Sequence, residues 1–103
     1  MSSTCICEIV TFKTNAGISP DETVELARGL QGFLATCPAF ISRSLTQDDD
    51  GIWTDYILWR SLSEAKSAGE AVMRAPEAGP FMAAIAPDSV KMTYHPVLLH
   101  QTA

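Results

Sequence analysis

Two β-rich segments joined by a tight turn, residues 40–47 (FISRSLTQ) and 52–60 (IWTDYILWR), restrict the fold more than any other feature. The turn between them, residues 48–51, ends in Asp-Gly, the strongest short-range hairpin signal, because glycine adopts the left-handed backbone conformation without a steric penalty. The two segments are therefore predicted to be neighbouring antiparallel strands. An isolated hairpin is marginal in water, so the remaining chain must supply further strands or helices that cover it.

Two helix starts flank the hairpin. Residues 19–22 (SPDE) offer a serine cap, a proline at the first helical position and a glutamate that completes a capping box. Apolar residues at three- and four-residue spacing extend this helix to Cys37, and Pro38 stops it. A second capping box, residues 61–64, opens a helix that continues through Ala75.

Three further segments complete the order of elements. Residues 5–13 are β-rich, residues 81–86 form a short helical piece, and residues 90–97 form a last strand. The resulting order, βαββαβ, predicts a ferredoxin-like α+β fold with a four-stranded antiparallel sheet and helices on one face. A length of 103 residues, 47% of them hydrophobic, fits one domain spanning 1–103 with a core of about 5–97.

Alternation along the strands sorts their residues into two faces, provided that no bulge interrupts a strand. One face is uncharged, and we expect the helices to cover it: Cys5, Cys7, Ile9, Thr11, Phe40, Ser42, Ser44, Ile52, Thr54, Tyr56, Leu58, Val90, Met92 and Tyr94. The other mixes large apolar and ionisable groups: Ile6, Glu8, Val10, Phe12, Ile41, Arg43, Leu45, Trp53, Asp55, Ile57, Trp59, Lys91, Thr93 and His95. Such a mixture is typical of a largely buried face that lines a small-molecule cavity.

Asp55 stands out on the second face because it lies between two tryptophans, and a carboxylate is rarely buried without a partner. It is a candidate general base for a phenolic proton. The alternative is a structural ion pair with Arg43 across the hairpin, and Arg43 is itself a candidate ligand-binding residue. Trp59 and Trp53 are candidates to stack on an aromatic ligand, with packing in a dimer interface as the alternative.

Two further ionisable groups fall on the same predicted face. His95 is a candidate acid or base, because imidazole exchanges protons near neutral pH; the alternative is a partly exposed structural residue beside Pro96. Glu8 is a candidate ligand-binding residue. Its alternative is a structural pair with Lys91 or His95, since the first and last strands are neighbours in this fold.

Charge and composition exclude several functions. Seven basic and 12 acidic residues give a net charge of −5, which disfavours nucleic acid and anionic membranes as partners. Residues 1–5 lack a basic targeting segment, and no apolar run approaches the ~18 residues of a membrane span, so we expect a cytoplasmic protein. The three cysteines (Cys5, Cys7 and Cys37) are expected to be reduced and packed as small hydrophobes, and no spacing predicts a metal site.

The order of elements, with Trp59 closing the third strand and Ser61-Leu62-Ser63-Glu64-Ala65 opening the next helix, resembles the dimeric α/β-barrel superfamily. It looks most like the antibiotic-biosynthesis-monooxygenase-like (ABM) branch, over residues 5–97. The resemblance implies a homodimer whose two sheets pack face to face, with a cavity between sheet and helices in each subunit. Some members are cofactor-free oxygenases that oxidise phenolic or anthrone-type polyketides to quinones, and others degrade haem.

Residue by residue, the resemblance is incomplete. In quinone-forming members a pocket tryptophan matches Trp59, whereas an asparagine four residues earlier is replaced here by Asp55. A tyrosine in the following helix has no counterpart, because Ala65 lies near its position. Haem-degrading members have an asparagine in the first strand, where this chain has Glu8, and a helix histidine that this chain lacks. Haem degradation is therefore not expected.

Two functions remain open from the sequence. The first is a cofactor-free monooxygenase-like protein acting on a small aromatic or quinol-type molecule, in which the tryptophans hold the ring and Asp55 or His95 moves the proton. Such a protein supplies only a dry pocket and a base, because the substrate anion itself reacts with oxygen. The second is a non-catalytic dimeric barrel that binds a small molecule or serves a stress response.

Overall fold

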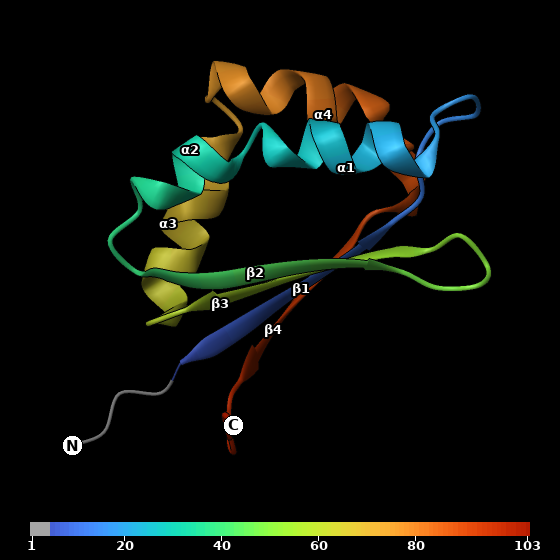
Figure 1. Ribbon diagram of the computed structural model, residues 1–103. Coiled ribbons are helices and arrows are strands. Elements are labelled where there is room, and N and C mark those ends of the chain that lie inside the picture. Colours follow the sequence, from blue (N-terminus) through green and yellow to red (C-terminus); the bar gives the residue numbers. More distant parts are fainter. Residues whose placement is uncertain (1–4) are drawn as a thin grey trace.

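The predicted βαββαβ order is present in the computed structural model, which describes residues 5–103 (Figure 1). Residues 1–4, used above to judge a targeting segment, lie outside the described residues. The four strands form one antiparallel sheet in the order β2-β3-β1-β4: β1 Ile6–Phe12, β2 Phe40–Gln47, β3 Trp53–Trp59 and β4 Lys91–Pro96. The helices lie on one face of this sheet (Figure 1), which confirms the ferredoxin-like α+β prediction.

The serine caps of both predicted capping boxes are formed. The Ser19 hydroxyl oxygen accepts a hydrogen bond from the Glu22 amide at 3.1 Å, and the Ser61 hydroxyl oxygen accepts one from the Glu64 amide at 3.3 Å. They open the helices α1 (Pro20–Arg28) and α3 (Leu62–Val72). Two short helices, α2 (Gln31–Ala35) and α4 (Gly79–Ala84), complete the layer, together with 3-10 turns at Pro76–Ala78 and Pro87–Ser89.

The prediction of one helix from residue 19 to residue 37 was wrong, because the chain breaks between α1 and α2. Gly29 lies at the break, and glycine is the weakest helix former after proline. A Cβ at Gly29 would lie 3.4 Å from the carbonyl oxygen of Glu77, so the absence of a side chain lets the 3-10 turn approach α1. The pattern of apolar spacing continued across the break and concealed it.

The β2–β3 hairpin closes as predicted. The Asp48 carboxylate accepts hydrogen bonds from the amides of Asp50 and Ile52, both at 2.9 Å, and Gly51 takes a φ of +82°. An Asp side chain that caps its own turn and a glycine in the left-handed region are the two contributions expected from this sequence. The turn fixes the register that places Arg43 near Asp55, since Leu45 pairs with Asp55 and Arg43 with Ile57.

The helices cover the face opposite to the predicted one. Phe12, Trp53 and Trp59 lie beneath the helix layer and are at most 4% exposed, and Glu8 and Asp55 lie on the same side, also buried. The prediction failed because it took absence of charge as the mark of a covered face. Burying the large aromatic rings gains more, and the ionisable groups among them find partners within the chain.

Two local features also shift the predicted faces. In β4 the order is inverted: Glu8 pairs with Tyr94 and Val10 with Met92, so His95 points away from the helices. Alternation within a strand does not say which of its two sets of side chains shares a face with a given set on the neighbouring strand. Only the pairing register between the strands decides this. In β2 a bulge between Phe40 and Ser42 turns Phe40 toward the helices, where its ring meets Trp59 edge-on with centroids 5.9 Å apart.

Candidate functional site

A cavity of about 350 Å³ lies between the helix-covered face of the sheet and the helices α2, α3 and α4. Its volume is at the lower end of the range for small-molecule sites, roughly 300–1,000 Å³. Most of the lining is apolar, with Trp59 and Ile57 from the sheet and Phe33 and Phe81 from the helix layer. Three ionisable side chains also reach the lining: Glu8, Arg43 and Asp55.

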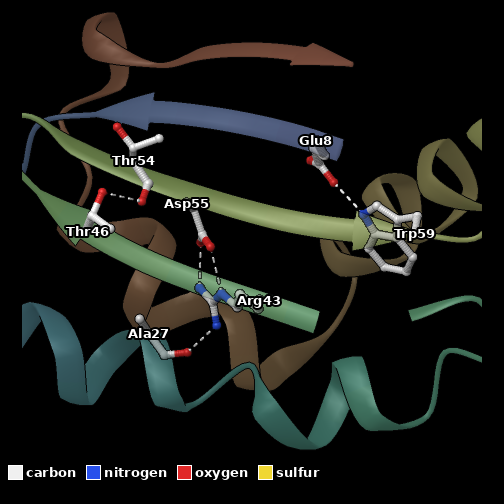
Figure 2. A network of polar contacts seen from close by, with 7 residues as sticks. All are labelled: Glu8, Ala27, Arg43, Thr46, Thr54, Asp55 and Trp59. Carbon is white, nitrogen blue, oxygen red and sulfur yellow. Dashed lines mark hydrogen bonds and ion pairs between the residues drawn. The ribbon is translucent and has the colours of Figure 1, made fainter. Parts of the chain in front are cut away.

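Arg43 and Asp55 form a buried bidentate ion pair (Figure 2). Arg43 Nε donates to Asp55 Oδ1 at 2.8 Å and Nη2 donates to Oδ2 at 2.7 Å, while Nη1 donates to the carbonyl oxygen of Ala27 in α1 at 2.8 Å. The structural ion pair, one of the two alternatives for Asp55, is therefore present. Both Asp55 oxygens are engaged, and the guanidinium joins the sheet to α1.

Glu8 and Trp59 form the second polar contact of the cavity. The indole Nε1–H of Trp59 donates to Glu8 Oε1 at 2.9 Å, and both side chains are buried (Figure 2). Burial raises the pKa of Glu8, and the negative charge of Asp55 raises it further, whereas the bond from Trp59 acts in the opposite direction. Among the described residues, Trp59 is the one side chain that hydrogen-bonds Glu8, which leaves the second carboxylate oxygen for a ligand.

The pairing predicted for Glu8 with Lys91 or His95 was wrong, because both of those residues lie on the outer face of the sheet. His95 is exposed, and its Nε2 lies 2.8 Å from the Thr93 hydroxyl oxygen. It is not part of the cavity lining. The placement of His95 beside Asp55 and Trp59 on one face, on which its candidate role rested, was therefore wrong.

The two tryptophans have different places. Trp59 lines the cavity, whereas Trp53 is outside the lining and stacks on Phe12 with ring centroids 6.3 Å apart. Both are buried within the single chain, at 2% and 4% exposure. Packing in a dimer interface, the alternative for both, does not account for their burial, because each ring is already covered within one chain.

Several lining residues were not found from the sequence. Val90 and Met92 of the last strand segment line the cavity, and the inverted phase of β4 hid them. Met82 and Phe81 were interpreted only as packing between helix and sheet, although they also face the cavity. The uncharged alternation of Val90, Met92 and Tyr94 predicted that they face the helices, as they do, but the cavity was expected on the opposite face of the sheet.

Thiols and metal ligands add nothing to the cavity. Cys5, Cys7 and Cys37 are free and half-buried, and burial raises the pKa values of the Cys7 and Cys37 thiols. Within residues 5–103, no three histidine, cysteine or acidic side chains gather in a group that would hold a metal ion. No helix in this part of the chain is long and apolar enough to cross a membrane.

Comparison with known proteins places the fold. No protein-family model matches the chain, and no curated protein matches its sequence. Among solved structures, the monooxygenase ActVA-Orf6 of Streptomyces coelicolor, in complex with nanaomycin D, superposes with a TM-score of 0.74 at 20% identity, over 98% of this chain and 94% of that one. SnoaB, a cofactor-independent oxygenase of Streptomyces nogalater, gives 0.63 at 16% identity over 96% of each chain.

A third similar structure, a Bordetella bronchiseptica protein assigned to the antibiotic biosynthesis monooxygenases, gives a TM-score of 0.73 at 10% identity, over 93% of this chain and 99% of that one. The structural neighbours are thus antibiotic biosynthesis monooxygenases over nearly the full length. At these identities the likeness shows the fold, and the cavity residues of this chain must carry any argument about chemistry.

Proposed function

We propose that this protein is a cofactor-independent oxygenase that removes a proton from a small phenolic or anthrone-type molecule held in the cavity. The observation that carries the proposal is one Glu8 carboxylate oxygen without a hydrogen-bond partner among the described residues, in a mostly apolar cavity beside the Trp59 ring. Two structural neighbours are oxygenases, and one of them was solved with the aromatic ligand nanaomycin D.

Glu8 is the proposed proton acceptor in place of Asp55. A general base must have a lone pair directed at the substrate, and Arg43 engages both oxygens of Asp55. Glu8 accepts one bond only, and its raised pKa brings it closer to the pKa of an acidic phenol, which favours proton transfer. The ionisable groups facing Glu8 are Asp55, which forms an ion pair with Arg43, and Tyr94 of β4. The pKa of Tyr94 is raised by burial and by the negative charge of Glu8.

The proposed reaction needs oxygen as its one co-reactant. Glu8 takes a proton from the substrate, the resulting anion is oxidised by O₂, and one oxygen atom is retained as a carbonyl. The other oxygen atom leaves as water with two hydrogens of the substrate CH₂ group, so that R₂CH₂ and O₂ give R₂C=O and H₂O. The apolar walls exclude bulk water from the anion, and the Trp59 ring supplies a flat surface for stacking.

Oxygen uptake by purified, chelator-treated protein tests this proposal, with anthrone as the substrate, because its ring CH₂ is the R₂CH₂ group of the reaction. General-base catalysis contributes about 10²–10⁴-fold, so Glu8→Gln is expected to lower kcat by at least about a hundredfold with little change in ligand Kd. The exposed Glu70→Gln is the matched control and should behave as wild type. Unchanged turnover in Glu8→Gln would exclude Glu8 as the base.

The alternative function, a non-catalytic ligand-binding barrel, is supported by the same apolar lining. Ligand binding without oxygen uptake by the wild type would favour it over the oxygenase.

We also propose a homodimer formed through the outer face of the sheet. Ile9, Tyr56 and Leu58 lie there, half-buried or exposed, with no helix over them. Light scattering at micromolar concentration should give twice the mass of one chain. A monomer would contradict this assembly.

A further inference from the structure

Exposed apolar side chains gather at the opening of the cavity. Eight large hydrophobic residues of the described chain are exposed, and four of them line this one cavity: Met73, Met82, Val90 and Met92. We name these four the rim. They come from the end of α3, from α4 and from the start of β4, which is an edge strand. Each of the three elements at the opening, α3, α4 and β4, therefore contributes an exposed apolar side chain at or near its end.

The rim contrasts with the inner wall. Glu8 and Trp59, which supply the polar contact, are 6% and 2% exposed, whereas Met73 is 70% exposed and Met92 48%. A ligand with its acidic hydroxyl on Glu8 has its ring inside the cavity and its remaining atoms directed to the opening. A ring held at Glu8 occupies the inner part of the cavity, so further atoms of the ligand reach the rim.

We propose that the rim is a second binding subsite, and that the ligand is an amphiphilic phenol whose apolar substituent lies across these four side chains. The proposal rests on the cavity being the ligand site, as in the proposed function. Methionine suits this role because its unbranched thioether chain adapts to substituents of different shape. Solvent exposure of isolated apolar residues is ordinary, but their concentration around one opening is typical of an interaction site.

The expected gain follows from the area buried. A methylene removed from water on all sides tightens binding about fourfold, and one that rests on an open rim remains wet on one side, so it gains about twofold. In a series of 4-n-alkylphenols from methyl to heptyl, Kd is therefore expected to fall about twofold per methylene once the chain passes the opening.

Anaerobic calorimetry with this series tests the subsite without turnover. Met73→Gln/Met92→Gln should lose the dependence of Kd on chain length, whereas Leu62→Gln, the same apolar-to-amide exchange at an exposed residue outside the cavity, should retain it. A wild-type Kd independent of chain length would overturn the subsite alone, and failure of every phenol to bind would overturn the cavity proposal as well. A lower mass of the double variant in light scattering would show instead that the rim contacts a second copy, and would also overturn the subsite.

Discussion

Removing one partner of the Arg43–Asp55 pair is expected to destabilise the fold strongly. In Asp55→Asn, the guanidinium loses its counter-charge and one of its two charge-assisted hydrogen bonds, because the amide nitrogen presents a donor to a donor. The Arg43 and Asp55 side chains are 11% and 6% exposed, so water cannot replace the lost contacts. Breaking such a pair from one side costs about 3–5 kcal/mol, out of roughly 5–15 kcal/mol for a domain.

Urea denaturation followed by tryptophan fluorescence measures this loss, because Trp53 and Trp59 are both buried and become exposed on unfolding. With a urea m-value of about 2 kcal/mol per molar, a loss of about 4 kcal/mol lowers the midpoint by about 2 M. The m-value itself should be unchanged, since the surface exposed on unfolding is the same.

The double variant Arg43→Met/Asp55→Leu separates a lost charge pair from lost packing. Apolar replacement of both partners avoids an uncompensated buried charge, so we expect it to be more stable than Asp55→Asn, within about 2 kcal/mol of the wild type. A residual loss is expected because the Ala27 carbonyl also loses its donor. An Asp55→Asn loss below 1 kcal/mol, or a double variant less stable than the single one, would refute the argument.

Three other substitutions test the remaining features. The raised pKa of Glu8 means that the folded state binds its proton more tightly than the unfolded state, so wild-type stability should fall as pH rises above the ordinary glutamate range. Glu8→Gln should remove this fall, so the stability difference between variant and wild type should grow with pH and vanish in acid. A difference that does not depend on pH would contradict this expectation. Trp59→Phe deletes the indole donor, so the Glu8 pKa should rise further and the pH profile of kcat should shift upward; an unmoved profile would show that Glu8 is not the proton acceptor. Gly51→Ala, at a φ of +82°, should lower the free energy of unfolding by about 1–2 kcal/mol, measured by thermal unfolding. Gly32→Ala, in a helix with open space around it, should leave stability unchanged or raise it. Equal effects of the two variants would exclude backbone strain as the cause.

The fold was predictable because its signals are local. Capping at Ser19 and Ser61 and the turn at Gly51 depend only on residues within a few positions, and each is formed as expected. The element order then leaves few topologies, since short connections and a hairpin restrict which strands are neighbours. The break at Gly29 escaped detection because the apolar spacing continues across it, and a single glycine is a weak signal inside a helical pattern.

The candidate site was only partly predictable. Arg43, Asp55 and Trp59 lie together because the hairpin fixes their register, and that register can be read from the turn. The phase of β4 against β1 has no such local signal, so His95 was grouped with Asp55 and Trp59, whose side of the sheet it does not share, and Met92 was not assigned to the cavity. Which face the helices cover depends on the balance between burying aromatic rings and desolvating charges, and here the buried carboxylates have hydrogen-bond partners in Arg43 and Trp59.

The pairing of β1 with β4 joins the two ends of the chain, from Ile6 opposite Pro96 to Thr11 opposite Lys91. During synthesis β1 emerges first, yet its second neighbour appears only when almost the whole polypeptide has left the ribosome. The β2–β3 hairpin can form at once, whereas pairings so distant in sequence are slow. Until then β1 has an unpaired edge, a site at which two nascent chains can join. A chain truncated before Val90 is expected to sediment as aggregate where the full chain stays in solution, and the β4 part of the cavity opening is the last to be completed.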